Sequence, residues 1–234
     1  MFYYDWSYIV LVLPFILLSL LASSSVKSTF NKYSKIASRR GITGAQAAER
    51  VLRANGVTGV RIERVAGDLT DHYDPKVNVI RLSDGVYDSP SVAAIGVACH
   101  EAGHAVQYAQ GYGPIQLRAA IIPITNIGSK LAMPLILIGL LLEIFAEISN
   151  IFVLLGVLCF SLSVIFQLIT LPVEFNASRR AVAAISQGNI LADEELEGAK
   201  KTLKAAAMTY VAATAVALMQ LLRLLLILSR RRRD

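Results

Sequence analysis

Two of the chain's three histidines lie four residues apart, in the sequence HEAGH at positions 100–104. On an α-helix, residues i and i+4 lie on one face, one turn apart, so the imidazoles of His100 and His104 can bind the same cation. Imidazole nitrogen is a common ligand of zinc, at about 2.0–2.1 Å. Glu101 is the next residue after His100, where a carboxylate can accept a proton from a metal-bound water without itself binding the metal. The pattern therefore predicts one Zn²⁺ ion bound by His100 and His104, with Glu101 as the general base.

A catalytic zinc site needs a third protein ligand and one position open to water. Glu174 is the best candidate, because it follows 26 uncharged residues (148–173) and an unpaired carboxylate there would be costly. Two alternatives stay open: Glu174 pairs with Arg179 or Arg180 at a helix end, or His72 is the ligand. Four other acids open the next predicted helix and are expected to be solvated there. They are Asp193, Glu194, Glu195 and Glu197.

Local patterns position the HEAGH motif on a helix that follows two strands. Thr43 begins a capped helical pattern that stops at Gly56. Residues 59–65 and 76–82 alternate apolar and polar side chains, which is typical of strands. Ser89, followed by proline, is expected to cap the helix that carries HEAGH and ends before Gly111.

The composition indicates a protein that lies partly in lipid. Of its 234 residues 55% are hydrophobic and only 17% are charged, whereas soluble domains have about 25% charged residues. The two cysteines cannot hold together a disulfide scaffold of this length. The formal net charge is +6, and the basic residues cluster beside the apolar segments. This arrangement predicts cytoplasmic flanks of membrane helices and contact with a lipid bilayer, and no nucleic-acid partner.

Three apolar segments predict membrane helices. Residues 6–26 and 148–173 hold no charge and are long enough to cross the hydrocarbon core. The segment 131–142 is too short alone and must extend at one of its ends. Basic residues follow the first span, so the positive-inside rule places the N-terminus outside. A cleaved signal peptide is the alternative, but the residues before the span include Asp5 and no lysine or arginine.

The last apolar segment, residues 205–222, leaves two topologies open. A fourth crossing would place the arginines at 230–233 outside, against the positive-inside rule. We therefore expect a C-terminal helix that lies on the inner leaflet, with a fourth crossing as the alternative. Either way the chain is a multi-pass protein of the cell membrane.

The motifs together resemble a known group of proteases. HEAGH, two membrane spans and then EFNASRRA from position 174 are similar to the integral-membrane gluzincin peptidases, which include the HtpX-like proteases and the CAAX prenyl endopeptidases. The stretches at 68–109 and 171–181 resemble more closely the YugP-type family of neutral membrane zinc metallopeptidases. The resemblance implies that His100, His104 and Glu174 bind zinc and that Glu101 is the general base.

The chain departs from the pattern of the wider group at Ser178. Those relatives have ExxxD, whose aspartate is expected to support a zinc ligand, and here Ser178 stands in its place. Ser178 or Asn176 can take over this role, since Glu174 and Ser178 share a helix face. Gln107 and Gln110 stand where the extended HExxHxxGxxH pattern has its glycine and third histidine.

The resemblance also implies a fold and an organisation of the chain. We expect an α-rich α+β fold, in which a zincin-like (gluzincin) catalytic domain with a small sheet is interleaved with transmembrane helices. The expected order is an N-terminal membrane helix (1–26), a cytoplasmic zincin-like part with the HEAGH helix (27–118), a membrane hairpin (119–173), a cytoplasmic helical part with the third zinc ligand (174–204), and a C-terminal apolar helix with a basic tail (205–234).

The function expected from these features is zinc-dependent hydrolysis of peptide bonds at the cytoplasmic face of the membrane. The substrate would be a peptide or membrane protein, extended along the strand at 76–82. Membrane-protein quality control follows only from analogy with the HtpX-like proteases. The oxyanion donor is left open among five residues. They are His72, Tyr73, Tyr87, Arg179 and Arg180.

Two other classes of protein fit parts of the sequence. The first is a membrane protein that binds metal structurally, without catalysis, and acts as an assembly partner. The second is a site-two-type intramembrane protease, which is disfavoured because no aspartate lies in a later apolar segment. The sequence does not determine the oligomeric state.

Overall fold

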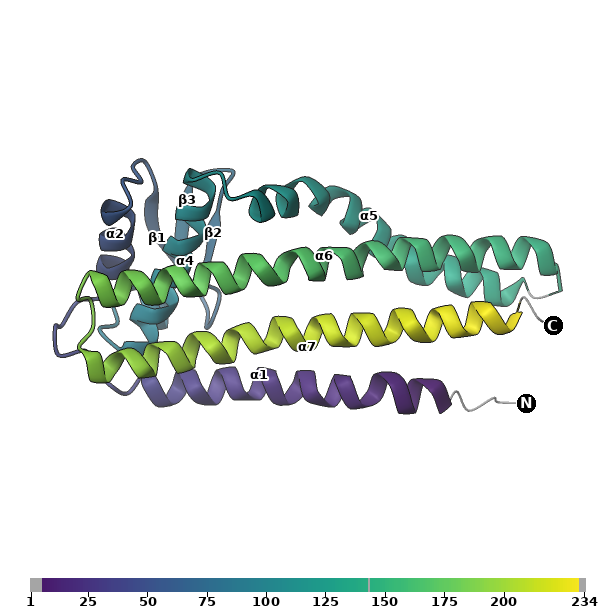
Figure 1. Ribbon diagram of the computed structural model, residues 1–234, viewed down its shortest axis with the longest axis horizontal. Coiled ribbons are helices and arrows are strands. Elements are labelled where there is room, and N and C mark those ends of the chain that lie inside the picture. The colour runs from purple at the N-terminus through teal and green to yellow at the C-terminus, as the bar shows by residue number, and fades with distance from the viewer. Residues whose placement is uncertain (1–5, 143, 232–234) are drawn as a thin grey trace. The chain divides into compact units, whose positions relative to one another are not determined.

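The computed structural model describes residues 6–142 and 144–231, which are mostly helical with one three-stranded sheet (Figure 1). The first five residues, Glu143 and the end of the predicted basic tail at 232–234 lie outside the described residues. The chain forms two compact units, each made of separate segments. One unit comprises residues 22–116 and 172–209, and the other comprises 1–21, 117–171 and 210–234.

The sheet has the strand order β1-β3-β2. The central strand β3 (Val79–Ser83) is parallel to β1 (Arg61–Val65) and antiparallel to β2 (His72–Asp74). Val79, Ile80 and Leu82 are fully buried. The expectation that a substrate pairs along 76–82 is therefore wrong, because the backbone of β3 is already bonded on both sides.

Helix α2 (Gly44–Ala54) begins as its sequence predicts. The hydroxyl of Thr43 accepts a hydrogen bond from the backbone of Gln46, and the Gln46 side chain accepts one from the backbone of Thr43. This capping box satisfies two backbone donors that the helix itself leaves free. The chain then reverses at Gly56, whose φ of +66° suits glycine.

Helix α4 (Val92–Ala109) carries HEAGH and begins two residues later than expected. The N-cap is Ser91, whose hydroxyl accepts a hydrogen bond from the backbone of Ala94 at 3.2 Å. Ser89 instead donates its hydroxyl to Ser91 at 3.0 Å, after the short helix α3 (Asp84–Tyr87). Ser89, the expected N-cap, therefore orients Ser91, which is the actual N-cap.

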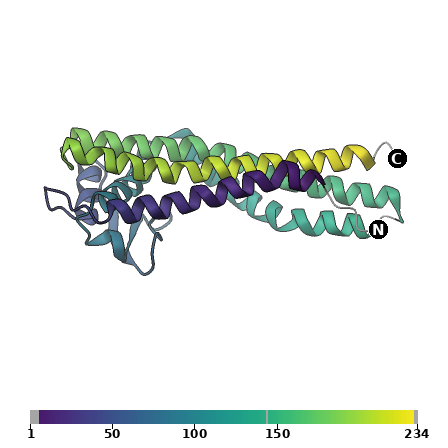
Figure 2. The same cartoon turned by 90° about the horizontal axis from the view of Figure 1, so that it is seen from below.

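The first unit has a single apolar core. It is built from β3, α2, α4 and the parts of α6 (Ala146–Gln187) and α7 (Asp193–Arg231) that belong to this unit. Figures 1 and 2 both show the end of α6 and the start of α7 side by side. The core holds α4 between the sheet and these two helices, so it fixes the face of α4 that carries the histidines.

The second unit contains apolar helical segments of membrane length. Four helices of the described chain are long and apolar enough to cross a membrane. They include α1 (Leu13–Tyr33), which follows a π-helical turn, and α5 (Gly113–Leu141), which extends the predicted span at 131–142 far toward the N-terminus. A Cβ atom on Gly139 would lie 2.9 Å from the carbonyl oxygen of Ser149, so α5 and α6 approach backbone to backbone.

The C-terminal part of α7 packs inside this second unit. Leu224 and Leu228 are buried against Ile136, Val153 and Val157 of α5 and α6. A helix lying flat on the inner leaflet would not be expected to pack along a membrane hairpin in this way. Helix α7 is also one of the four helices of the described chain that are long and apolar enough to cross a membrane, so the alternative of a fourth crossing stays open.

Candidate metal centre

Helices α4 and α6 bring together His100, His104 and Glu174. Nε2 of His100 lies 3.3 Å, and Nε2 of His104 lies 3.4 Å, from the same carboxylate oxygen of Glu174. Each of the three residues offers one ligand atom, and these atoms lie within 4.8 Å of one another. Two atoms that each lie 2.0–2.1 Å from a tetrahedral zinc ion are about 3.3–3.4 Å apart. The observed spacing between imidazole and carboxylate atoms therefore fits one zinc ion.

Gly103, the fourth residue of HEAGH, allows this approach. A Cβ atom at Gly103 would lie 2.9 Å from the carbonyl oxygen of Ala177 and 3.4 Å from its Cα. Real Cβ atoms essentially never lie that close to a backbone oxygen. Since Ala177 is one turn beyond Glu174, the missing side chain lets α6 place its carboxylate beside both imidazoles.

The burial of Glu174 gives the site its electrostatic character. The Glu174 side chain is only 2% exposed, and the side chains of His100 and His104 are 14% and 11% exposed. A buried carboxylate is costly unless a positive charge or hydrogen bonds compensate it. Of the two suggested pairing partners, Arg179 is exposed, and Arg180 donates hydrogen bonds to Asn176 at 2.7 Å and Gln110 at 2.6 Å. A divalent cation among the three side chains would compensate the charge of Glu174.

Each imidazole also has a hydrogen-bond partner at Nδ1, the ring nitrogen that does not face Glu174. Nδ1 of His100 lies 3.2 Å from the Ser178 hydroxyl, and Nδ1 of His104 lies 3.0 Å from Oε1 of Gln107. When each Nδ1 carries the proton and donates it to these oxygens, each Nε2 is free to bind a metal. Ser178, which stands at the aspartate position of the ExxxD pattern considered above, thus contacts His100.

Gln107 is a site residue that the sequence did not reveal. It is completely buried, and its Nε2 donates to the backbone oxygen of Val173 and to Oδ1 of Asn176, both at 2.9 Å. Asn176 therefore acts one step away from the histidines, through Gln107. The only signal was the i+3 spacing from His104, which places both side chains near each other on the helix.

The charges around the site favour the protonated form of His104 while no metal is bound. Burial by itself lowers the pKa of this histidine, but the hydrogen bond to Glu174 and the nearby charges of Glu101 and Glu174 outweigh it and raise the pKa. Glu101 is buried, at 8% exposed, and does not belong to the ligand cluster. A carboxylate beside the metal ligands but outside the cluster suits a base.

Asp71 is an acid near Glu101 whose pKa is raised, chiefly by burial. Burial raises the pKa of Asp71, hydrogen bonds from the backbone and hydroxyl of Ser83 oppose this shift, and the charge of Glu101 adds to it. Asp71 was not among the predicted site residues, because nothing in its spacing relates it to HEAGH.

The other predicted candidates lie elsewhere. His72 is exposed on β2, with Nδ1 2.8 Å from the Thr70 oxygen, and it is not in the cluster. Three of the four acids that open α7 form ion pairs or hydrogen bonds with other residues. Glu194 pairs with Arg39, Glu197 pairs with Lys200, and Glu195 accepts backbone hydrogen bonds from Arg39 and Ala192.

None of the contacts described for the five suggested oxyanion donors involves the ligand cluster. Tyr73 donates its hydroxyl to Asn78 at 2.7 Å, and the ring of Tyr87 lies under Arg64. Arg179 is exposed. The donor stays unassigned.

Comparison with known proteins places this geometry in a family. A family model described as "Putative neutral zinc metallopeptidase" matches residues 8–229. The chain belongs to this family. It is also 49% identical, over 210 residues, to the "Putative membrane protease YugP" of Bacillus subtilis (strain 168), covering 90% of this chain and 91% of that protein. No solved structure matches. The matched range of this zinc metallopeptidase family includes α4, α6 and all three candidate ligands, and the predicted resemblance is confirmed.

Proposed function

We propose that the chain is a membrane-embedded zinc endopeptidase, with His100, His104 and Glu174 as the metal ligands. The observation that carries the proposal is the pair of distances, 3.3 and 3.4 Å, from the two Nε2 atoms to one buried carboxylate oxygen. Membership in a zinc metallopeptidase family and the likeness to a membrane protease support the same reading.

The chemistry follows from the residues around the ligands. A zinc ion bound there would act as a Lewis acid on the scissile carbonyl and lower the pKa of the attacking water. Glu101 accepts the proton of that water and passes it to the leaving amine. Ser178 and Gln107 keep Nδ1 of each histidine protonated, so that Nε2 faces the metal position.

An extended substrate would pair with β2 rather than with β3. Strand β2 is at an edge of the sheet, so one side of its backbone is free of strand partners among the described residues. Helix α4 contacts β2, and the ring of Tyr73 on β2 lies 5.6 Å from that of Tyr108, one turn after His104. An antiparallel edge strand beside the metal-binding helix supports a zincin-like catalytic domain and backbone recognition of the peptide.

The catalytic unit is proposed to face the cytoplasm. Lys27, Lys32 and Lys35 follow the first apolar span, and Arg179 and Arg180 follow the third, as the positive-inside rule requires for cytoplasmic segments. Catalysis at the membrane surface is consistent with α6, which continues from an apolar span directly into the segment that carries Glu174. A quality-control role stays a prediction.

One experiment separates an endopeptidase from a structural metal protein. We expect the purified full-length protein to bind one zinc ion per chain and to cleave casein, and chelation followed by zinc to abolish and restore cleavage. Glu101→Gln should retain the zinc and lose cleavage by at least about 100-fold, because general bases contribute about 10²–10⁴-fold. Glu49→Gln, an exposed acid paired with Arg53, is the control. Full activity of Glu101→Gln would contradict the mechanism. Zinc binding without cleavage by the wild type would favour the structural role.

A further inference from the structure

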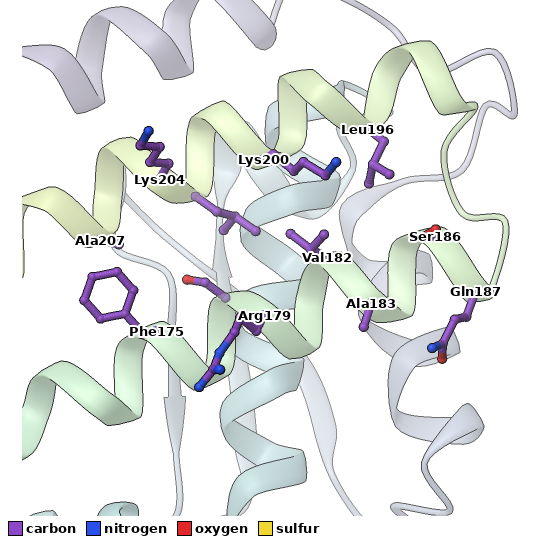
Figure 3. A pocket seen from close by; sticks show the side chains of 12 residues that line it. Phe175, Arg179, Val182, Ala183, Ser186, Gln187, Leu196, Lys200, Lys204 and Ala207 are labelled. Carbon is purple, nitrogen blue, oxygen red and sulfur yellow. The ribbon is translucent and has the colours of Figure 1, made fainter.

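An apolar groove lies between α6 and α7 in the unit that holds the candidate metal centre. Its volume is about 680 Å³, within the range of about 300–1,000 Å³ that is typical of ligand pockets. Val182, Leu196 and Leu203 line it, and Phe175 lies at one end (Figure 3). Phe175 is 41% exposed, so its aromatic ring is open to a ligand.

Three cationic side chains flank this apolar surface. Arg179 belongs to α6, and Lys200 and Lys204 belong to α7. Figure 3 shows the Arg179 side chain pointing away from α7 and the Lys204 side chain pointing away from α6, so the positive charges are spread along the rim of the groove. None of the residues that line the groove is acidic. Lys200 forms an ion pair with Glu197 at 2.7 Å, but both side chains are substantially exposed. Such a pair contributes little and can be exchanged for another anion.

The groove is not where the scissile peptide would bind. Ser178 lines it, and the hydroxyl of this residue lies 3.2 Å from Nδ1 of His100. Nε2, on the other side of the ring, faces Glu174 at 3.3 Å. A molecule in the groove would therefore lie behind His100, away from the metal position. An apolar surface with a cationic rim in that place suits an amphiphilic anion that is distinct from the peptide substrate.

We propose that this groove binds an anionic phospholipid, with an acyl chain along Phe175, Val182 and Leu203 and the headgroup at the rim, beside the lysines of α7, Lys200 and Lys204 (Figure 3). Helix α6 reaches the groove immediately after the apolar span at 148–173, and the residues of α7 that line it extend from Leu196 to Ala207, at the start of the apolar segment 205–222. A membrane lipid is thus the anionic amphiphile available where these helices leave their spans. The proposal does not depend on the hydrolase activity.

The test is lipid binding to the full-length protein in neutral detergent, measured by native mass spectrometry. We expect saturable binding of one phosphatidylglycerol and weaker binding of phosphatidylcholine with the same acyl chains. The double variant Lys200→Ala/Lys204→Ala should bind phosphatidylglycerol about 30-fold more weakly, since each basic residue near an anionic headgroup contributes a factor of about five. The control Lys35→Ala/Lys201→Ala loses the same charge outside the groove and should bind like the wild type.

A second variant tests the apolar part without changing charge. Val182→Trp should fill the groove and weaken phosphatidylglycerol binding, while the zinc content stays that of the wild type. Glycerol phosphate, which has the headgroup anion but no acyl chain, should not displace the lipid. Equal binding of the two lipids, equal losses in the two lysine double variants, or displacement by glycerol phosphate would overturn the proposal. The Glu101→Gln experiment would be unaffected by any of these results.

Discussion

Oε1 of Gln107 lies 3.0 Å from Nδ1 of His104, while the amide nitrogen of the same side chain donates to two oxygens of α6. One buried side chain therefore orients a metal ligand of α4 and ties that helix to the helix that carries Glu174. A hydrogen-bonded outer partner of this kind fixes both the tautomer of the ligand and the direction of its ring.

Replacing Gln107 by methionine should weaken zinc binding. The side chain keeps its approximate size but loses its acceptor for His104 and its donors for Val173 and Asn176, and changes of this kind cost about 10–100-fold in metal affinity. The dissociation constant is measured by competition with a chelator, and the protonation of His104 by nitrogen NMR. Gln110→Met, which removes only the contact to Arg180, is the matched control. Identical affinities for both variants would show that Gln107 does not position the ligand.

Gly103→Ala should separate the two ligand helices. The added methyl group would meet the backbone of Ala177 at 2.9 Å, so α6 must shift, at a cost of about 1–3 kcal/mol for overpacking. We expect a lower midpoint of thermal unfolding and weaker zinc binding. Gly96→Ala on the same helix meets its nearest atom, the Cβ of Ala199, at an ordinary 3.5 Å and serves as control. Zinc binding of Gly103→Ala at wild-type strength would show that the close approach of α4 and α6 does not position the ligands.

Zinc binding should weaken on acidification from a higher pH than for an ordinary histidine. The pKa of His104 is raised, and a proton on its imidazole competes with the metal. In the zinc-free protein the pairing of protonated His104 with Glu174 stabilises the fold fully below pH 6.5. That contribution is lost as the pH rises through the raised pKa. Zinc titrations and thermal unfolding across this range test both effects. In a zinc-free His104→Gln variant, stability should not decrease as the pH rises through this range. If the decrease persists in the variant, it does not come from His104.

A fourth crossing by α7 predicts that the C-terminus lies on the opposite side of the membrane from the catalytic unit. Leu224 and Leu228 pack with the α5–α6 hairpin, although the arginines at 230–233 favour the inside. A cysteine placed at Ser229 should react with a membrane-impermeant maleimide in intact cells. A cysteine at Lys35 should react only after permeabilisation. If the cysteine at position 229 does not react in intact cells, α7 does not make a fourth crossing, and the expected helix on the inner leaflet is supported instead.

The residues of the candidate site could be selected from the sequence by local arguments, while their roles stay predictions. The helical spacing of His100 and His104 does not depend on the rest of the fold, and Glu174 was selected because a lone acid after an apolar span needs a compensating charge. The structure brings all three together. The sequence offered Ser178 or Asn176 as the residue that supports a histidine, and the structure shows Ser178 beside Nδ1 of His100.

Features that depend on packing between distant segments were not predictable. The strand pattern at 76–82 gave no indication that β3 lies between two partners, since pairing order is a property of the whole sheet. No role was predicted for Gln107 from the sequence, because its contacts with Val173 and Asn176 exist only when α6 lies against α4. The close approach through Gly103 likewise requires Ala177 to be in place.

Anomalous diffraction from zinc-loaded crystals, recorded at the zinc edge, tests the central claim most directly. We predict one zinc ion at about 2.0–2.2 Å from Nε2 of His100, from Nε2 of His104 and from the carboxylate of Glu174, with a solvent molecule as the remaining ligand. A zinc ion located elsewhere, or a fourth protein ligand in place of the solvent, would contradict the account.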